Sequence, residues 1–207
     1  MKRLGILLSG RGSNFLAIAD SIAQGKLRGA EIAVVISNQP DAPGLSAAKA
    51  RGFSARVIAS NGRKRADHDA EIVECLRQHG VQLVCLAGYM RLLSPEFVAA
   101  FPAAIVNIHP SLLPAFPGLN AQRQALDYGV QWTGCTVHFV DEKLDHGVII
   151  LQRAVPVLEG DTEASLSARI LEQEHIAYPE ALARILSGRY AIVDRRYVCQ
   201  EAQPEIR

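Results

Sequence analysis

The first half of the chain alternates short apolar runs with segments whose apolar residues recur at helical spacing. The first cycle is an apolar run at 5–8, a Gly-rich turn, and then apolar positions every three or four residues until Gly25. Continuous apolar runs are typical of strands buried on both faces of a parallel sheet. The pattern predicts strands at 5–8, 32–36, 55–58, 81–87 and 104–108, and helices ending at Gly25, over 45–51, over 66–79 and from Pro95, with Ser94 as N-cap.

The second half has a different pattern. Two apolar strands are predicted at 137–140 and 148–155, joined by an acidic loop at 141–147. A loop this short joins adjacent strands, so the sheet is expected to be mixed. A long helix follows over about 162–186, and Pro179 should kink it because proline removes a backbone hydrogen bond.

The tail at 190–198 is expected to form a small terminal hairpin.

The composition is that of a globular protein. Hydrophobic residues at 49% and charged residues at 21% are ordinary globular proportions, which exclude a disordered or fibrous protein. We therefore expect one α/β domain over residues 1–207. Its architecture is predicted to have three layers, a mostly parallel (mixed) central sheet and a Rossmann-like N-terminal half.

Charge is nearly balanced, with 22 Lys and Arg against 21 Asp and Glu and a formal net charge of +1. A nucleic-acid partner would require a clustered basic excess, so the short Arg-Lys runs are read as solvated surface. The four cysteines form no C-x-x-C pair, which argues against a zinc site. No apolar run approaches the length of a membrane span. A cytoplasmic enzyme or binding protein is expected.

The Gly-rich turn at 10–14 lies between a predicted strand and a predicted helix. Free backbone N–H groups and the positive helix end would suit a phosphate there. Phe15 occupies the place of the third glycine of a dinucleotide fingerprint, and the Gly-Lys-Ser/Thr of a P-loop is missing. A single phosphate monoester is the predicted ligand. The alternative is a tight turn in which Ser13 or Asn14 caps the helix.

Asn107 and His109 close the fifth predicted strand, and residues two apart on a strand face the same way. An amide beside an imidazole can hold a carbonyl oxygen while a proton moves. Asp145, in the acidic loop, could supply a carboxylate that favours the charged imidazole. Alternatively, His109 is an ordinary strand-end residue and Asp145 part of a turn. His138 is a rival acid–base candidate, for which a hydrogen-bonded core role is expected.

The sequence contains no serine elbow, catalytic-cysteine signature or histidine pair with metal-helix spacing. Metal-free acid–base chemistry is the remaining prediction.

The stretch 107–114, Asn-Ile-His-Pro-Ser-Leu-Leu-Pro, followed by Leu144-Asp145, resembles the formyltransferase superfamily. The motifs at 9–14, 87–94 and 173–175 are similar to those of the phosphoribosylglycinamide formyltransferase family. The likeness covers residues 3 to 188 and implies the formyltransferase fold and the formylation of glycinamide ribonucleotide. The implied co-substrate is 10-formyltetrahydrofolate.

The resemblance also implies a role for each matching residue. Asn107 would polarise the formyl oxygen, His109 would donate a proton, and Asp145 would keep His109 protonated. The substrate phosphate would be held by Gly12, Ser13 and Asn14, its ribose by Glu174, and the folate by Arg65, Met90, Arg91, Leu92, Leu93 and Asn107.

Three positions depart from the family pattern. Asn120 and Gln122 stand where many members carry histidine, and His146 stands where a small residue is common. Two other enzymes of the superfamily are alternatives. A methionyl-tRNA formyltransferase is disfavoured by the balanced charge and by the end of the chain at Arg207. A formyltetrahydrofolate hydrolase is disfavoured because it usually carries a further N-terminal domain, whereas this chain starts directly with its first predicted strand. A non-catalytic phosphosugar- or folate-binding module is the rival of another class. Only small-molecule partners, glycinamide ribonucleotide and reduced folate, are expected, for a monomer or homodimer.

Overall fold

The computed structural model describes residues 1–200. Each strand and helix predicted from the sequence has a counterpart, with boundaries shifted by a few residues. The strands are β1 (Lys2–Leu8), β2 (Ala30–Ser37), β3 (Ala55–Val57), β4 (Leu83–Leu86), β5 (Ile105–His109), β6 (Trp132–Phe139), β7 (Ile149–Pro156), β8 (Tyr190–Val193) and β9 (Arg196–Cys199). The helices are α1 (Ser13–Ala23), α2 (Pro43–Ala50), α3 (Arg65–Gln78), α4 (Pro95–Ala100), α5 (Ala121–Tyr128) and α6 (Glu163–Leu186).

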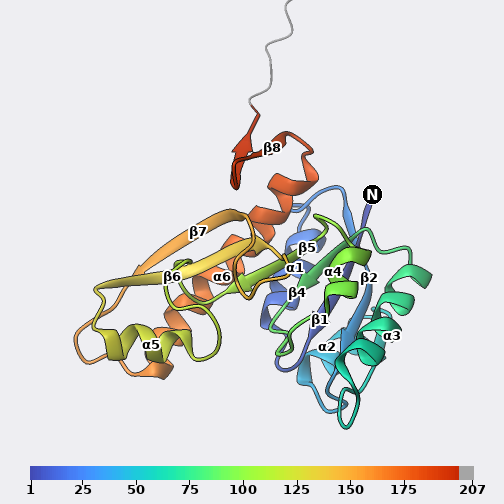
Figure 1. The fold of residues 1–207 in the computed structure, drawn as a ribbon, viewed down its shortest axis with the longest axis horizontal. Coiled ribbons are helices and arrows are strands. Elements are labelled where there is room, and N and C mark those ends of the chain that lie inside the picture. Colours follow the sequence, from blue (N-terminus) through green and yellow to red (C-terminus); the bar gives the residue numbers. More distant parts are fainter. Residues whose placement is uncertain (201–207) are drawn as a thin grey trace, which may run out of the picture.

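The central sheet has seven strands in the order β3-β2-β1-β4-β5-β6-β7 (Figure 1). The first five are parallel, and β6 and β7 are antiparallel to their neighbours. The predicted mostly parallel, mixed sheet is therefore confirmed. Strands β2 and β3 lie on one side of β1, and the chain then crosses over to place β4 on the other side. The strand order therefore reverses between β1 and β4.

Two hydrophobic cores, one on each face of the sheet, define the predicted three layers. One core includes Phe15 of α1, Leu45 of α2 and Leu182 of α6, all at most 2% exposed. The other includes Ile72 of α3 and Phe97 of α4, both fully buried. The second half of the sheet, with β6, β7 and α5, extends away from the α3 and α4 side in Figure 1.

The sequence pattern missed α5 and the first residues of β6. The apolar face of α5 consists mainly of the small, buried Ala121 and Ala125, which give a weak periodic signal. Asn120 begins the helix in the left-handed conformation, with φ of 57°, and Gly129 ends it with φ of 80°. In β6, Trp132 is 60% exposed, so the strand begins without an apolar run.

The predicted tail hairpin is confirmed as β8 and β9, which pair in an antiparallel two-stranded sheet. It follows α6, which continues as one helix through Pro179. The Tyr190 and Tyr197 rings stack with centroids 4.7 Å apart, and Tyr190 also stacks on Phe139 at 6.2 Å. The tail therefore packs against the end of β6.

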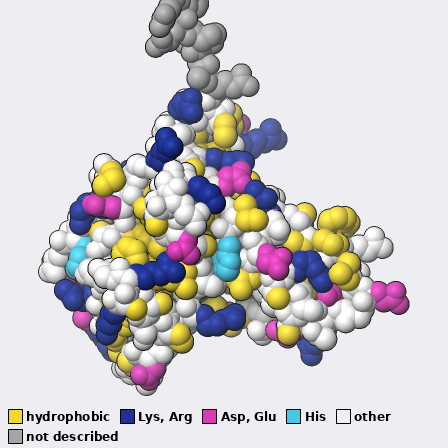
Figure 2. All heavy atoms as spheres, turned by 180° about the vertical axis from the view of Figure 1, so that it is seen from behind, with side chains coloured by type: hydrophobic (Ala, Val, Ile, Leu, Met, Phe, Trp, Pro, Cys, Tyr) yellow, Lys and Arg dark blue, Asp and Glu magenta, His cyan; other side chains and the backbone are white. Residues whose placement is uncertain are grey.

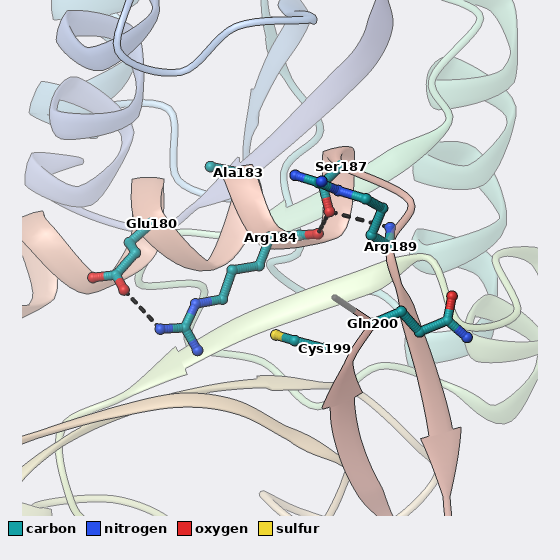
Figure 3. A pocket seen from close by; sticks show the side chains of 7 residues that line it. All are labelled: Glu180, Ala183, Arg184, Ser187, Arg189, Cys199 and Gln200. Atoms are coloured by element: carbon teal, nitrogen blue, oxygen red, sulfur yellow. Dashed lines mark hydrogen bonds and ion pairs between the residues drawn. The ribbon is translucent and has the colours of Figure 1, made fainter. Parts of the chain in front are cut away.

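A cavity of about 500 Å³ lies between the end of α6 and the tail (Figure 3). It is lined by Glu180, Ala183, Arg184, Ser187, Arg189, Cys199 and Gln200, and none of these is a predicted site residue. On the face shown in Figure 2, acidic and basic side chains are interspersed. Within residues 1–200, no helix is long and apolar enough to cross a membrane.

Candidate active site

The predicted phosphate, ribose and acid–base residues gather around the carboxyl ends of β1, β4 and β5. Open α/β sheets bind ligands where the strand order reverses, which here is between β1 and β4. Ser9, directly after β1, joins the two neighbouring loops. Its N–H donates to the Gly88 carbonyl at 3.1 Å, and its hydroxyl accepts from the Met90 N–H at 2.9 Å. The Gly-rich turn and the 88–93 loop therefore form one continuous rim.

The Gly-rich turn starts α1 without a side-chain cap. Gly12 is the N-cap, with φ of 71°, and a Cβ added there would lie 2.8 Å from the Cα of Gly44. The alternative in which Ser13 or Asn14 caps the helix is therefore wrong, because both lie within the first turn. The first helical backbone bond joins Leu16 N–H to the Gly12 carbonyl at 3.0 Å. The earlier N–H groups of the helix remain available to an anion.

Replacing Gly12 by alanine should lower the stability of the protein. The left-handed backbone and the contact with Gly44 both oppose a methyl group, and we expect a loss of roughly 1–3 kcal/mol. In a domain of this size, each kcal/mol lowers Tm by about 2–4 °C, which thermal unfolding would measure. Gly10→Ala is the matched control, because a Cβ there meets nothing within 4 Å. Equal Tm values for the two variants would contradict the argument.

Asn14 and Glu174 are brought together from α1 and α6. The Asn14 amide donates to the Glu174 carboxylate at 2.7 Å, and both residues are only 7% exposed. Burial raises the pKa of Glu174 above its ordinary 4.5, and the hydrogen bond from Asn14 offsets part of this shift. Asn14 Oδ1 is buried without a partner among the described residues. A ligand hydroxyl that donates to this oxygen would satisfy it.

The position of Glu174 is set by Tyr178, one turn further along α6. Its hydroxyl lies 3.1 Å from the Leu86 carbonyl and 2.9 Å from the Val106 carbonyl, so it bridges β4 and β5. Tyr178 is fully buried. The helix is therefore fixed directly beneath the two strands whose ends form the site.

The structure also brings His109 and Asp145 together. His109 Nδ1 lies 3.3 Å from Asp145 Oδ2, and its Nε2 lies 2.8 Å from the Phe116 carbonyl. Both side chains are less than a tenth exposed. Because each ring nitrogen faces an oxygen acceptor, a doubly protonated imidazolium satisfies both contacts.

Asp145 is held by its backbone and by a second loop. It adopts the left-handed conformation, with φ of 48°. Its Oδ2 accepts from the Gly118 N–H at 2.8 Å, so the carboxylate links the 141–147 loop to the loop after β5. A non-glycine residue in this conformation is uncommon and is often found at functional sites.

His138 has the buried, hydrogen-bonded role expected from the sequence, and it also contacts Asn107. It is 1% exposed, and Nδ1 donates to the Phe139 carbonyl at 2.7 Å. Burial lowers the pKa of His138, while the Phe139 hydrogen bond and the Asp145 charge act in the opposite direction. In the neutral ring, Nε2 accepts from the Asn107 amide at 3.3 Å. His138 therefore orients Asn107.

A cavity lies between the 88–93 loop and the 141–147 loop. Predicted site residues among its lining are Arg91, Leu92, Leu93, Asn107 and Asp145, and further lining comes from Leu86, Tyr89, His138, Val140, Asp141, Glu142, Lys143 and Leu144. The other two predicted folate contacts are not part of this lining. Met90 is 70% exposed, and Arg65 is an exposed residue at the start of α3.

The cavity combines two kinds of wall. Leucine side chains stand beside polar groups, which suits a ligand with an apolar face and a polar edge. The Tyr89 hydroxyl and Arg91 Nε are buried without partners among the described residues. Such groups gain a hydrogen bond when a polar ligand edge arrives.

The chain belongs to the formyl transferase family, which it matches over residues 2–182. Its fold is that of glycinamide ribonucleotide transformylase 1 from Symbiobacterium toebii, with 51% identity and a TM-score of 0.94 over 97% of this chain and 95% of that one. It is 43% identical to the phosphoribosylglycinamide formyltransferase of Escherichia coli K12, covering 89% of this chain and 87% of the relative.

Larger proteins contain a similar segment. The trifunctional purine biosynthetic protein adenosine-3 of Drosophila pseudoobscura pseudoobscura is 46% identical over 210 residues, which is 100% of this chain and 15% of that protein. The chain therefore spans about a seventh of the length of this relative. The family expected from the motifs is confirmed.

Proposed function

We propose that the protein transfers the formyl group of 10-formyltetrahydrofolate to the amine of 5-phosphoribosylglycinamide. The products are formylglycinamide ribonucleotide and tetrahydrofolate. The observation that carries this proposal is the meeting of Asn107, His109 and Asp145 beside the open end of α1 and the Asn14–Glu174 pair. In this proposal the whole chain acts as one formyltransferase domain, and its cytoplasmic location and monomeric or dimeric state stay predictions.

The substrate is held at its phosphate and its ribose. The free N–H groups at the start of α1, contributed by Ser13 and its neighbours after Gly12, would bind the phosphate. Glu174 would accept hydrogen bonds from the ribose hydroxyls, and a hydroxyl donating to Asn14 Oδ1 would satisfy that buried oxygen. These contacts aim the glycinamide amine at the tip of β5.

Transfer would then proceed without a covalent enzyme intermediate. The amine nitrogen attacks the formyl carbon, and the carbonyl oxygen becomes a tetrahedral oxyanion. An N–H of the Asn107 amide would stabilise this oxyanion. The Nε2–H of His109 would exchange the Phe116 carbonyl, which it faces in the structure, for the oxyanion, with Asp145 balancing the imidazolium charge. The bond to N10 then breaks, and the proton lost by the amine is passed to N10.

A spectrophotometric folate-release assay tests the proposed function. With 10-formyltetrahydrofolate and glycinamide ribonucleotide, we expect one formylated ribonucleotide for each tetrahydrofolate formed. Without the ribonucleotide, release should stop. Release of formate at the same rate in its absence would identify a hydrolase, and binding of both ligands without turnover would identify a binding module.

Replacing Glu174 by glutamine should weaken substrate binding while stabilising the protein above pH 5. Burial raises the Glu174 pKa above its ordinary value of 4.5, so ionising this carboxyl is less favourable in the folded protein than in the unfolded chain. The wild type therefore loses stability as the pH rises above 4.5 and Glu174 ionises. The variant lacks this loss, so its Tm advantage should grow between pH 4.5 and pH 7.5. The KM for glycinamide ribonucleotide should rise about tenfold or more, because hydrogen bonds to a charged group are strong.

The matched control is Glu172→Gln, an exposed position two residues away on α6. It should change neither the Tm difference between the two pH values nor the KM. A Glu174→Gln variant with an unchanged KM would remove Glu174 from the ribose site. A Tm difference that does not depend on pH would contradict the burial argument.

A further inference from the structure

The loop that carries Asp145 is restrained on two sides. Its site-facing contacts are His109 and the Gly118 N–H. At its base, the Phe139 N–H donates to the Val148 carbonyl at 2.9 Å, and Gly147 packs against the Phe139 carbonyl so closely that a Cβ would sit 1.8 Å from it. The outer side of the loop, away from β5, faces the tail hairpin.

Arg195, at the tip of the tail hairpin, contacts this outer side directly. Its guanidinium donates to the His146 carbonyl, and Nη1 lies 3.3 Å from His146 Nδ1. The His146 ring in turn lies 2.8 Å from the Asp141 carboxylate. Burial alone would raise the pKa of Asp141, yet hydrogen bonds from His146 and Lys143 and the charges of His146 and Arg195 lower it overall. Arg195 is thus linked to both ends of the loop.

The hairpin that carries Arg195 is anchored independently of this contact. At its base, the Gln200 N–H donates to the Arg189 carbonyl at 2.9 Å. Along its length, the stacked rings of Tyr190 and Tyr197 lie against Phe139, the last residue of β6. The hairpin therefore contacts Phe139 before the Asp145 loop and His146 near the end of that loop. It lies beyond the end of α6 in Figure 1.

The hairpin turn itself disfavours arginine. Asp194 and Arg195 both have positive φ, 47° and 65°, as in a two-residue turn in which glycine suits the second position. An arginine backbone is strained there by about 1 kcal/mol or more. The side-chain contacts of Arg195 with His146 offset this strain, which gives the arginine a role at this position that glycine lacks.

Removing Arg195 would leave the loop room to move. A cavity of about 370 Å³ lies on the outer side of Asp145, and its lining includes Leu113, Leu144, His146 and Arg195. Arg195 is the lining residue contributed by the tail. Without its guanidinium, the loop could relax into this space and draw the Asp145 carboxylate away from His109.

We propose that Arg195 is a positioning residue for formyl transfer, acting through His146 to fix the loop that presents Asp145 to His109. This inference rests on the proposed function. The family match ends at residue 182, so the tail hairpin lies outside it. Arg195 touches neither substrate in this account, and its effect reaches the reaction only through the geometry of the loop.

Arg195→Gly is the informative variant, because glycine suits the turn and the fold should be retained. We expect kcat to fall about 10- to 100-fold, since misplacement of a group that orients a catalytic side chain has effects of this size. The KM for glycinamide ribonucleotide should stay within about twofold, because its phosphate and ribose contacts lie on α1 and α6. Arg195→Lys, which keeps a donor for the His146 carbonyl, should recover part of kcat.

Arg196→Ala removes the same charge from the adjacent exposed position and should leave kcat unchanged. A wild-type kcat in Arg195→Gly, with Tm unchanged or raised, would overturn the proposal. A fall in kcat that Arg195→Lys does not relieve at all would also count against it.

Hydrogen exchange of the backbone amides gives a second measurement that requires no turnover. Amides of 141–147 should exchange faster in Arg195→Gly than in the wild type or in Arg196→Ala. Unchanged exchange would overturn the proposal even if the folate-release assay succeeds. Faster exchange in a protein that fails the folate-release assay would locate the error in the proposed function and leave the role of Arg195 in holding the loop intact.

Discussion

Replacing His109 by alanine is expected to lower kcat for formyl transfer by about 10²–10⁴, the usual contribution of a positioned general acid. The variant loses an imidazole that lies 3.3 Å from the Asp145 carboxylate and also faces a second acceptor, the Phe116 carbonyl. Steady-state folate release with glycinamide ribonucleotide measures the effect. Calorimetric binding of the ribonucleotide is the internal control, because Gly12, Asn14 and Glu174 remain in place.

Asp145→Asn extends this test. If Asp145 acts by orienting and balancing His109, the two substitutions should not be additive, and the double variant should be little slower than His109→Ala alone. Additive losses would mean that Asp145 acts on the substrate independently. A His109→Ala enzyme that is folded, binds the ribonucleotide and turns over near the wild-type rate would refute the proton-donor role.

The repeated strand, turn and helix pattern was enough to predict the parallel half of the fold. Continuous apolar runs marked β4 and β5, and the two-residue alternation of β5 placed Asn107 and His109 on one side of the sheet end. Local signals also identified Ser94, whose hydroxyl accepts from the Phe97 N–H at 3.2 Å as the N-cap of α4. These features depend on neighbours in the sequence, so pattern analysis can reach them.

The features that were missed depend on pairing between distant segments. His138 reaches Asn107 because the antiparallel register of β5 and β6 sets these two residues opposite each other, and the β6–β7 register shifts next to His138. Nothing local to residue 138 specifies that register. The contact of Arg195 with His146 likewise joins residues 49 apart through the docking of the tail hairpin. The sequence shows the residues of each pair, but it does not show that they are in contact.

Asn107→Ala is the second substitution with a large expected effect, a fall in kcat of about 10²–10³, the usual result of removing one oxyanion donor. The prediction depends on which way the amide faces. Neutral His138 gives its Nδ1 hydrogen to the Phe139 carbonyl, so its Nε2 can only accept, and the Asn107 nitrogen must turn toward it. One amide hydrogen then satisfies His138, and the other is left for the developing oxyanion.

Asn107→Asp separates this account from a role in packing. The carboxylate has nearly the same shape as the amide, but it offers no donor to His138 or to the oxyanion and adds a repelling negative charge. We therefore expect Asn107→Asp to be at least as slow as Asn107→Ala in the folate-release assay. If the aspartate variant kept most of the wild-type kcat, shape rather than hydrogen-bond donation would explain the residue, and the oxyanion would need another donor.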